Sequence, residues 1–278
     1  MEQLSVVLYW FAFALYVVAT VLYAYQFVLR RQKVAWWARF ATGAGFILQT
    51  LAIGANSVAN DGTPLTGSNQ LVLASWALVL LYFVMEHLLK IRSYGAFLIP
   101  VAVVLMAAAQ LMGGSEASLA PQPEILSGWG VAFHVGLIVF ANAGFAVGAV
   151  SALLYLYQSS QLKSHRSNRM SRRLPSLATL QMVSRRAIAL AFPVYTAGLS
   201  LGIIRAIQVD VGGWFFDARI MMSGVVLITF AIYLVLAYRP DISNHTVAWV
   251  AVLGFVFVVI LAIIARTLPV GFHVFGQL

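Results

Sequence analysis

Two histidines and a run of aromatic residues are the side chains of this sequence best suited to binding a cofactor. His134 lies near the start of one long apolar segment, and His273 lies just beyond the last one. Between them, three aromatic residues are consecutive: Trp214, Phe215 and Phe216. Neutral imidazoles are good ligands for iron, and two of them can bind a haem from opposite faces. The pattern therefore indicates a haem site in which the aromatic rings lie against the porphyrin.

Each of these features also has a plainer interpretation. Aromatic residues are common at headgroup depth on both sides of a membrane, and an imidazole at that depth is an ordinary polar residue. For the rings alone, or for one histidine alone, this interfacial interpretation is favoured. The histidines and the rings are far apart in the sequence, however, and we expect all of them on one membrane face. Because an imidazole at a membrane boundary is costly to desolvate without a partner, this convergence favours haem.

The composition is that of an integral membrane protein. Of the 278 residues, 62% are hydrophobic and only 9% are charged, whereas soluble domains carry about 25% charged residues. The apolar residues occur in blocks of about 20, the length of helix that crosses a hydrocarbon layer about 30 Å thick. We therefore expect an all-α, polytopic membrane protein. The eight expected spans cover approximately residues 4–29, 35–58, 71–89, 96–112, 129–157, 187–207, 220–238 and 246–268.

The basic residues predict how these spans are oriented. Of the 17 lysines and arginines, 14 lie in alternate loops, and the positive-inside rule places those loops in the cytoplasm. Both termini then lie outside, as do Arg205 and Arg219. The net charge of +9 does not indicate nucleic acid, because the basic residues lie in short loops beside apolar segments.

The longest inner connection, residues 159–186, is rich in serine, lysine and arginine. Its favoured role is to set the orientation and to contact anionic lipid, and a docking site for a cytoplasmic partner is the sharper alternative. The chain has no cysteine, which excludes disulfides, thiolate metal sites and CxxC redox chemistry of its own. The first apolar segment lacks a preceding basic stretch, so it is interpreted as a span and not as a cleavable signal. We expect a multi-pass protein of the bacterial inner membrane.

Four stretches of the sequence, taken in order, resemble a known family. They read SNQLVLASWALVLLYFVME, WGVAFHVGLIVFANAGFAVGAVSALLYLYQ, LPSLATLQMVSRRAIALAFPVYTAGLSLGII and VGFHVF. Together they resemble the cytochrome c assembly family of haem-handling membrane proteins, of the CcsA/ResC and CcmC type, over roughly residues 65 to 275. In that family two external histidines are the axial haem ligands, and the resemblance assigns this role to His134 and His273. A tryptophan-rich loop presents the haem, and it corresponds to residues 211–217.

The loop departs from the family pattern, which reads approximately W-G-x-x-W-x-W-D-P-K-E. Trp214 and Asp217 match it, whereas Phe216 stands where a tryptophan is usual. Phenylalanine keeps a ring face but loses the indole N–H donor. Arg219 replaces the lysine and can pair with a haem propionate in bidentate geometry, and Arg205 is a further candidate for that contact.

The resemblance implies a haem-binding protein of cytochrome c biogenesis that holds haem on the outer face for delivery or attachment to apocytochrome c. Family synthetases also work with a second membrane assembly subunit. At most, the chain is part of a haem-attachment (haem lyase) system, and no residue is predicted to be catalytic. The length and the altered loop resemble the HemX-like branch, whose members are linked to control of haem biosynthesis, and this is the alternative. A transporter without haem is less favoured, since no internal repeat is evident.

Two further expectations concern the organisation of the chain. Residues 1–64 are expected to form two N-terminal helices, and residues 65–278 the haem-handling region. His87, near the inner end of the third span, could ligate a second haem. The favoured interpretation is that it forms an interfacial pair with Glu86 near Lys90.

Overall fold

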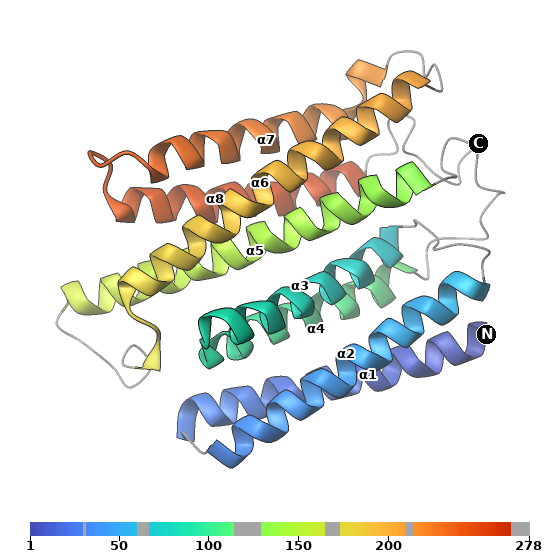
Figure 1. Ribbon diagram of the computed structural model, residues 1–278, viewed down its shortest axis with the longest axis horizontal. Coiled ribbons are helices and arrows are strands. Elements are labelled where there is room, and N and C mark those ends of the chain that lie inside the picture. Colours follow the sequence, from blue (N-terminus) through green and yellow to red (C-terminus); the bar gives the residue numbers. More distant parts are fainter. Residues whose placement is uncertain (30–31, 60–66, 114–128, 165–172, 209–213, 268–278) are drawn as a thin grey trace. The chain divides into compact units, whose positions relative to one another are not determined.

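The computed structural model describes residues 1–29, 32–59, 67–113, 129–164, 173–208 and 214–267. In these ranges the secondary structure is helical, and the expected all-α fold is confirmed. The α-helices are α1 (Glu2–Leu29), α2 (Gln32–Ala59), α3 (Gly67–Leu89), α4 (Gly95–Gly113), α5 (Trp129–Lys163), α6 (Leu177–Gln208), α7 (Ala218–Ala237) and α8 (Asn244–Thr267). Two short 3-10 helices are η1 (Arg92–Tyr94) and η4 (Trp214–Phe216) (Figure 1).

Most of the described helices, though not α2, have the apolar composition of membrane spans. Five of them, α1, α3, α5, α6 and α7, are long and apolar enough to cross a bilayer, and α4 and α8 contain shorter apolar stretches. Large apolar side chains such as Val104, Leu190 and Ile228 are exposed, as expected for surfaces that face lipid. The predicted polytopic membrane protein is therefore confirmed, whereas the predicted orientation of its termini stays a prediction.

The chain divides into two compact units. Unit 1 contains α1 to α4, and unit 2 contains α5 to α8. The two units are defined by how compactly their residues pack, and not by function. The predicted boundary near residue 65, between the N-terminal helices and the haem-handling region, stays a prediction.

In unit 1, α1 packs against α2 and α4 through a stripe of tyrosines. Tyr9, Tyr16 and Tyr23 recur every seven residues and are buried, so they lie on one face of the helix. Buried tyrosine hydroxyls need hydrogen-bond partners. The hydroxyl of Tyr9 donates to the main-chain oxygen of Met106 at 2.6 Å, and that of Tyr16 donates to Oε1 of Gln49 at 2.8 Å. These bonds fix α1 against α4 and α2.

The third tyrosine joins a charged network. The hydroxyls of Tyr23 and Tyr82 are 2.6 Å apart, and Tyr82 donates to Oε2 of Glu86 at 3.0 Å. Glu86 also forms an ion pair with Arg39 of α2. His87 is exposed at the end of α3. The structure thus gives Glu86 the partners Arg39 and Tyr82, where the sequence had suggested an interfacial pair with His87.

In unit 2, α5 and α6 pack closely because small residues line their interface. A Cβ atom on Gly148 would lie 2.5 Å from Cγ1 of Ile188, so only glycine fits there without a shift. Behind this contact, the rings of Phe145 and Phe230 stack with centroids 3.8 Å apart, which ties α7 to α5. Each helix of unit 2 contacts its sequence neighbour, and α8 also packs against α5 (Figure 1).

The start of α6 differs from the sequence prediction. The sixth span was expected to begin near residue 187, but α6 begins at Leu177. The Oγ atom of Ser176 accepts a hydrogen bond from the main-chain N–H of Thr179 at 3.2 Å, which is an N-cap contact. The prediction took the charged residues Arg185 and Arg186 to lie before the start of the span. The helix instead starts where Ser176 caps it. Consequently, Arg185 and Arg186 belong to a helix and not to a loop.

Candidate functional site

His134 lies in the first turns of α5 and is held by the backbone of α6. Its Nδ1 atom is 2.6 Å from the main-chain oxygen of Gly198. A carbonyl oxygen only accepts, so Nδ1 must carry the proton in this contact. In the neutral imidazole the lone pair is then on Nε2. The hydrogen bond therefore selects the tautomer in which Nε2 is free to bind a metal.

A second glycine makes room for this ring. A Cβ atom on Gly202 would lie 2.6 Å from Cε1 and 2.8 Å from Nδ1 of His134, closer than real Cβ atoms approach. Gly198 and Gly202 are one turn apart on α6 and face the same imidazole. The main-chain oxygen of Gly198 accepts the hydrogen bond, and Gly202 has no side chain in the space that the ring occupies. Both residues of α6 therefore determine the position and orientation of His134.

This arrangement fits a haem ligand. Histidines that bind metals usually donate their other ring N–H to a carbonyl or carboxylate, which fixes the ring and raises the basicity of the ligating nitrogen. His134 has that contact in the described structure. The second predicted ligand, His273, follows α8 in the sequence and lies outside the described residues. The end of α8 at Thr267 lies at the same end of unit 2 as the start of α5 (Figure 1).

The aromatic loop is partly described. The short helix η4 begins at Trp214, whose side chain lies outside the described part of the structure. Phe215 and Phe216 are 65% and 80% exposed, and their rings meet edge to face with centroids 5.9 Å apart. Exposed rings can cover a planar ligand or lie among lipid headgroups, so their exposure is compatible with both interpretations.

Asp217 links the loop to α7. Its side chain is only 4% exposed, and Oδ1 accepts a hydrogen bond from the main-chain N–H of Ile220 at 3.3 Å. This is the contact of a helix N-cap. The cap fixes the start of α7 directly after Phe216, so one role of Asp217 is to position the aromatic residues.

Of the two arginines predicted to pair with haem propionates, the structure describes the side chain of Arg205 but not that of Arg219. Arg205 lies in the last turn of α6, is partly buried and has an interaction partner of its own. The end of α6 that carries Arg205 lies at the same end of unit 2 as the start of α5, which carries His134 (Figure 1). The side chain of Arg219 lies outside the described residues.

Sequence reasoning proposed His134 as a ligand and missed the two glycines that hold it. The spacing Gly198-x-x-x-Gly202 within an apolar segment was a usable signal, because small residues four apart mark close helix packing in membranes. That spacing predicts a helix contact, although it does not say which side chain fills the gap.

Comparisons with known proteins point to one family. A family model described as cytochrome c assembly protein matches residues 65–273. The cytochrome c biogenesis protein CcsA of Guillardia theta is 24% identical over 247 residues, which cover 82% of each chain. Protein HemX of Brevibacillus brevis is 26% identical over 226 residues, 81% of this chain and 82% of that one. Protein HemX of Bacillus subtilis (strain 168) is 22% identical over 236 residues, 84% and 85% of the two chains.

Proposed function

The chain belongs to the cytochrome c assembly protein family, and from this premise we propose that it binds haem for delivery or attachment to apocytochrome c. The haem site lies at the end of unit 2 that carries His134. The observation that carries the proposal is the hydrogen bond from Nδ1 of His134 to Gly198, because it leaves Nε2 available to iron.

The predicted residues take distinct roles in this proposal. Nε2 of His134, together with His273, would hold the haem iron. The rings of Trp214, Phe215 and Phe216 lie against the porphyrin, where aromatic faces pack well. Among the basic residues of that end, Arg205 and Arg219 pair with the propionates, and Asp217 holds the loop by capping α7.

The contribution of this chain is binding and orientation. When bound, haem supplies the vinyl groups to which the thiols of an apocytochrome add. The imidazoles and rings hold the ligand in a fixed pose, which provides proximity to a thiol-bearing partner on the outer face. Apocytochrome c and a second membrane assembly subunit are the partners that this proposal implies. The site of action is the bacterial inner membrane.

A regulatory function is the second candidate. Two of the similar proteins are named HemX and match this chain over more than four fifths of their length. The loop also has Phe216 where the assembly pattern has a tryptophan. In this alternative, haem bound at His134 is sensed, and the basic segment 159–186 signals to haem synthesis in the cytoplasm.

The absorption spectrum of the protein extracted from membranes tests haem binding. We expect a Soret band with bis-histidine character, which His134→Ala and His273→Ala each remove or shift. His245→Ala is the matched control, because His245 is exposed at the start of α8 and has no proposed role in haem binding. Retention of the wild-type spectrum by both His134→Ala and His273→Ala would overturn the proposed ligation.

Deletion in the native host separates the two candidates. Loss of covalent c-type cytochromes supports delivery or attachment. Altered levels of haem precursors with normal c-type cytochromes support the regulatory alternative.

A further inference from the structure

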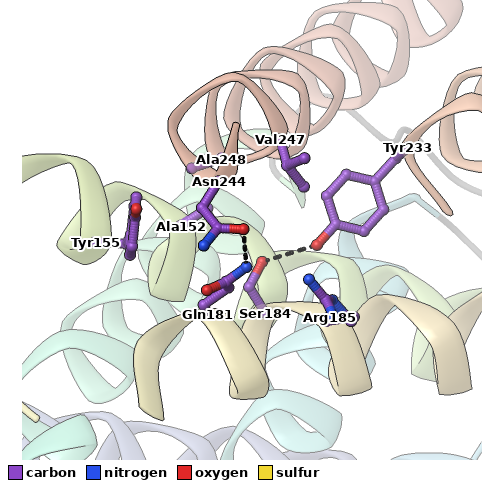
Figure 2. Close-up of a pocket in the computed structure, with 9 residues that line it drawn as sticks. All are labelled: Ala152, Tyr155, Gln181, Ser184, Arg185, Tyr233, Asn244, Val247 and Ala248. Carbon is purple, nitrogen blue, oxygen red and sulfur yellow. Dashed lines mark hydrogen bonds between the residues drawn. The ribbon is translucent and has the colours of Figure 1, made fainter. Parts of the chain in front are cut away.

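A pocket lies among the helices of unit 2, in the half remote from His134. Its enclosed space holds about one water molecule, and its mouth is open to solvent. Figure 2 shows its lining, which comes from all four helices of the unit. The lining residues are Ala152, Tyr155, Gln181, Ser184, Arg185, Tyr233, Asn244, Val247 and Ala248.

Among the described residues that line the pocket, Arg185 is the only one with a charged side chain. Its Nε atom is buried and has no hydrogen-bond partner in the described part of the chain. Its guanidinium carbon is 5.3 Å from the centroid of the Tyr238 ring, so one face of the cation is covered. No carboxylate of the described residues lies within ion-pair distance of it. A buried N–H of a charged group without an acceptor is unfavourable, and it indicates that an acceptor is missing.

Further donors line the same pocket. The hydroxyls of Ser184 and Tyr233 are 3.3 Å apart, a long contact that either can exchange for a better acceptor. Gln181 donates to Oδ1 of Asn244, which leaves the amide group of Asn244 as a donor (Figure 2). Asn244 is also the first residue of α8, where the helix dipole favours an anion.

The chemistry of the lining matches a tetrahedral oxyanion. Donors reach the pocket from α6, α7 and α8, thus from several directions, whereas a planar carboxylate presents two oxygens in one plane. Asp241, shortly before α8, is exposed and pairs with Arg239 at 3.8 Å, and it forms no ion pair with Arg185. We propose that Arg185, Ser184, Tyr233 and Asn244 bind a phosphate group at the mouth of this pocket.

A lipid is the favoured source of this phosphate. Tyr238, which stacks on Arg185, is exposed at the end of α7. It continues a stripe of exposed apolar residues spaced three or four apart along α7, namely Met221, Val225, Ile228, Ile232 and Val235. Acyl chains can lie along this stripe while the headgroup phosphate lies at the mouth of the pocket. The site concerns anionic phospholipid and is independent of the proposed haem site.

Native mass spectrometry of the full-length protein tests the pocket. The protein is mixed with dioleoyl phosphatidylglycerol, dioleoyl phosphatidylcholine or inorganic phosphate, and bound molecules are counted. We expect phosphatidylglycerol to bind in preference to phosphatidylcholine, and Arg185→Gln to weaken it about tenfold, as for loss of a charge-assisted hydrogen bond. Arg186→Gln is the matched control, because it removes the same charge from an exposed neighbour on α6.

The outcomes are distinct. If Arg185→Gln and Arg186→Gln weaken lipid binding equally, the effect is one of general surface charge and the proposed site is wrong. If Arg185→Gln binds phosphatidylglycerol as tightly as the wild type does, the proposed site is also wrong. Competition by inorganic phosphate that depends on Arg185 supports the pocket and identifies free phosphate as its ligand.

A second variant protects the test against misfolding. Tyr233→Phe keeps the ring and removes only the hydroxyl, and we expect phosphatidylglycerol binding to fall roughly threefold, as for loss of one neutral hydrogen bond. Unchanged binding by Tyr233→Phe would contradict the role of this hydroxyl as a donor to the phosphate.

Discussion

Nδ1 of His134 and the main-chain oxygen of Gly198 are 2.6 Å apart, so the backbone of α6 determines which nitrogen of a side chain on α5 can bind a metal. One turn further along α6, Gly202 leaves the space that the ring occupies. The orientation of the candidate ligand is thus a property of the α5–α6 contact, and changes in α6 that leave His134 in place test it.

Gly202→Ala is expected to displace the imidazole of His134. The added Cβ atom would lie 2.6 Å from Cε1, so the ring must move and the hydrogen bond to Gly198 is strained or lost. Loss of such a supporting contact commonly weakens metal binding about 10- to 100-fold. Haem titration followed by absorption measures this change.

Gly136→Ala is the matched control for that experiment. It changes α5 two residues from His134, and its Cβ atom would meet nothing within 4 Å. Equal haem affinity of Gly202→Ala and wild type would show that the seat on α6 does not orient the ligand.

Gly148→Ala should destabilise unit 2. Its Cβ atom would lie 2.5 Å from Cγ1 of Ile188, and overpacking of this kind costs about 1 to 3 kcal/mol. Unfolding of the detergent-solubilised protein measures the loss. Gly224→Ala on α7, where a Cβ atom meets nothing within 4 Å, should leave the free energy of unfolding unchanged or slightly raised.

Asp217→Ala should lower stability by about 1 kcal/mol, because α7 loses its N-cap. Asp217→Asn should retain most of this stability, since asparagine caps as well as aspartate. The pair of variants separates capping from charge in haem binding. If Asp217→Asn loses haem while its unfolding is unchanged, the carboxylate has a direct role at the haem site.

Glu86→Gln should destabilise unit 1 more than the loss of an exposed charge does. The Glu86 side chain is 10% exposed and its partner Arg39 is 35% exposed, so solvent screens the pair only in part. We expect a cost of about 1 to 2 kcal/mol from the unpaired arginine and the altered contact to Tyr82. Thermal unfolding and a double-mutant cycle with Arg39→Gln measure the coupling.

His87→Ala serves as the neighbouring control for Glu86→Gln. His87 is exposed, so its removal should change the free energy of unfolding by no more than about 0.5 kcal/mol. If His87→Ala lowers the free energy of unfolding as much as Glu86→Gln does, the result would support the pair of Glu86 and His87 that the sequence had suggested.

The sequence by itself determined the class of the protein, and it predicted the α-helices that the structure has in its described residues. The length of an apolar block and the charge of a short loop are local properties of the sequence. They do not depend on which helices pack together, so they can be recognised without the structure. The family resemblance and His134 were likewise accessible, because motifs keep their order in the sequence. The family model that matches residues 65–273 agrees with that interpretation.

The contacts were decided only by the tertiary structure. Three contacts depend on how each helix is rotated and shifted against its neighbours. They are the packing of His134 on Gly198 and Gly202, the ion pair of Glu86 with Arg39, and the position of Arg185 in the pocket lining. Hydropathy places a helix in the bilayer but is nearly indifferent to its rotation. Close packing at small residues and the need to satisfy buried polar groups select that rotation, and both act between segments far apart in the chain.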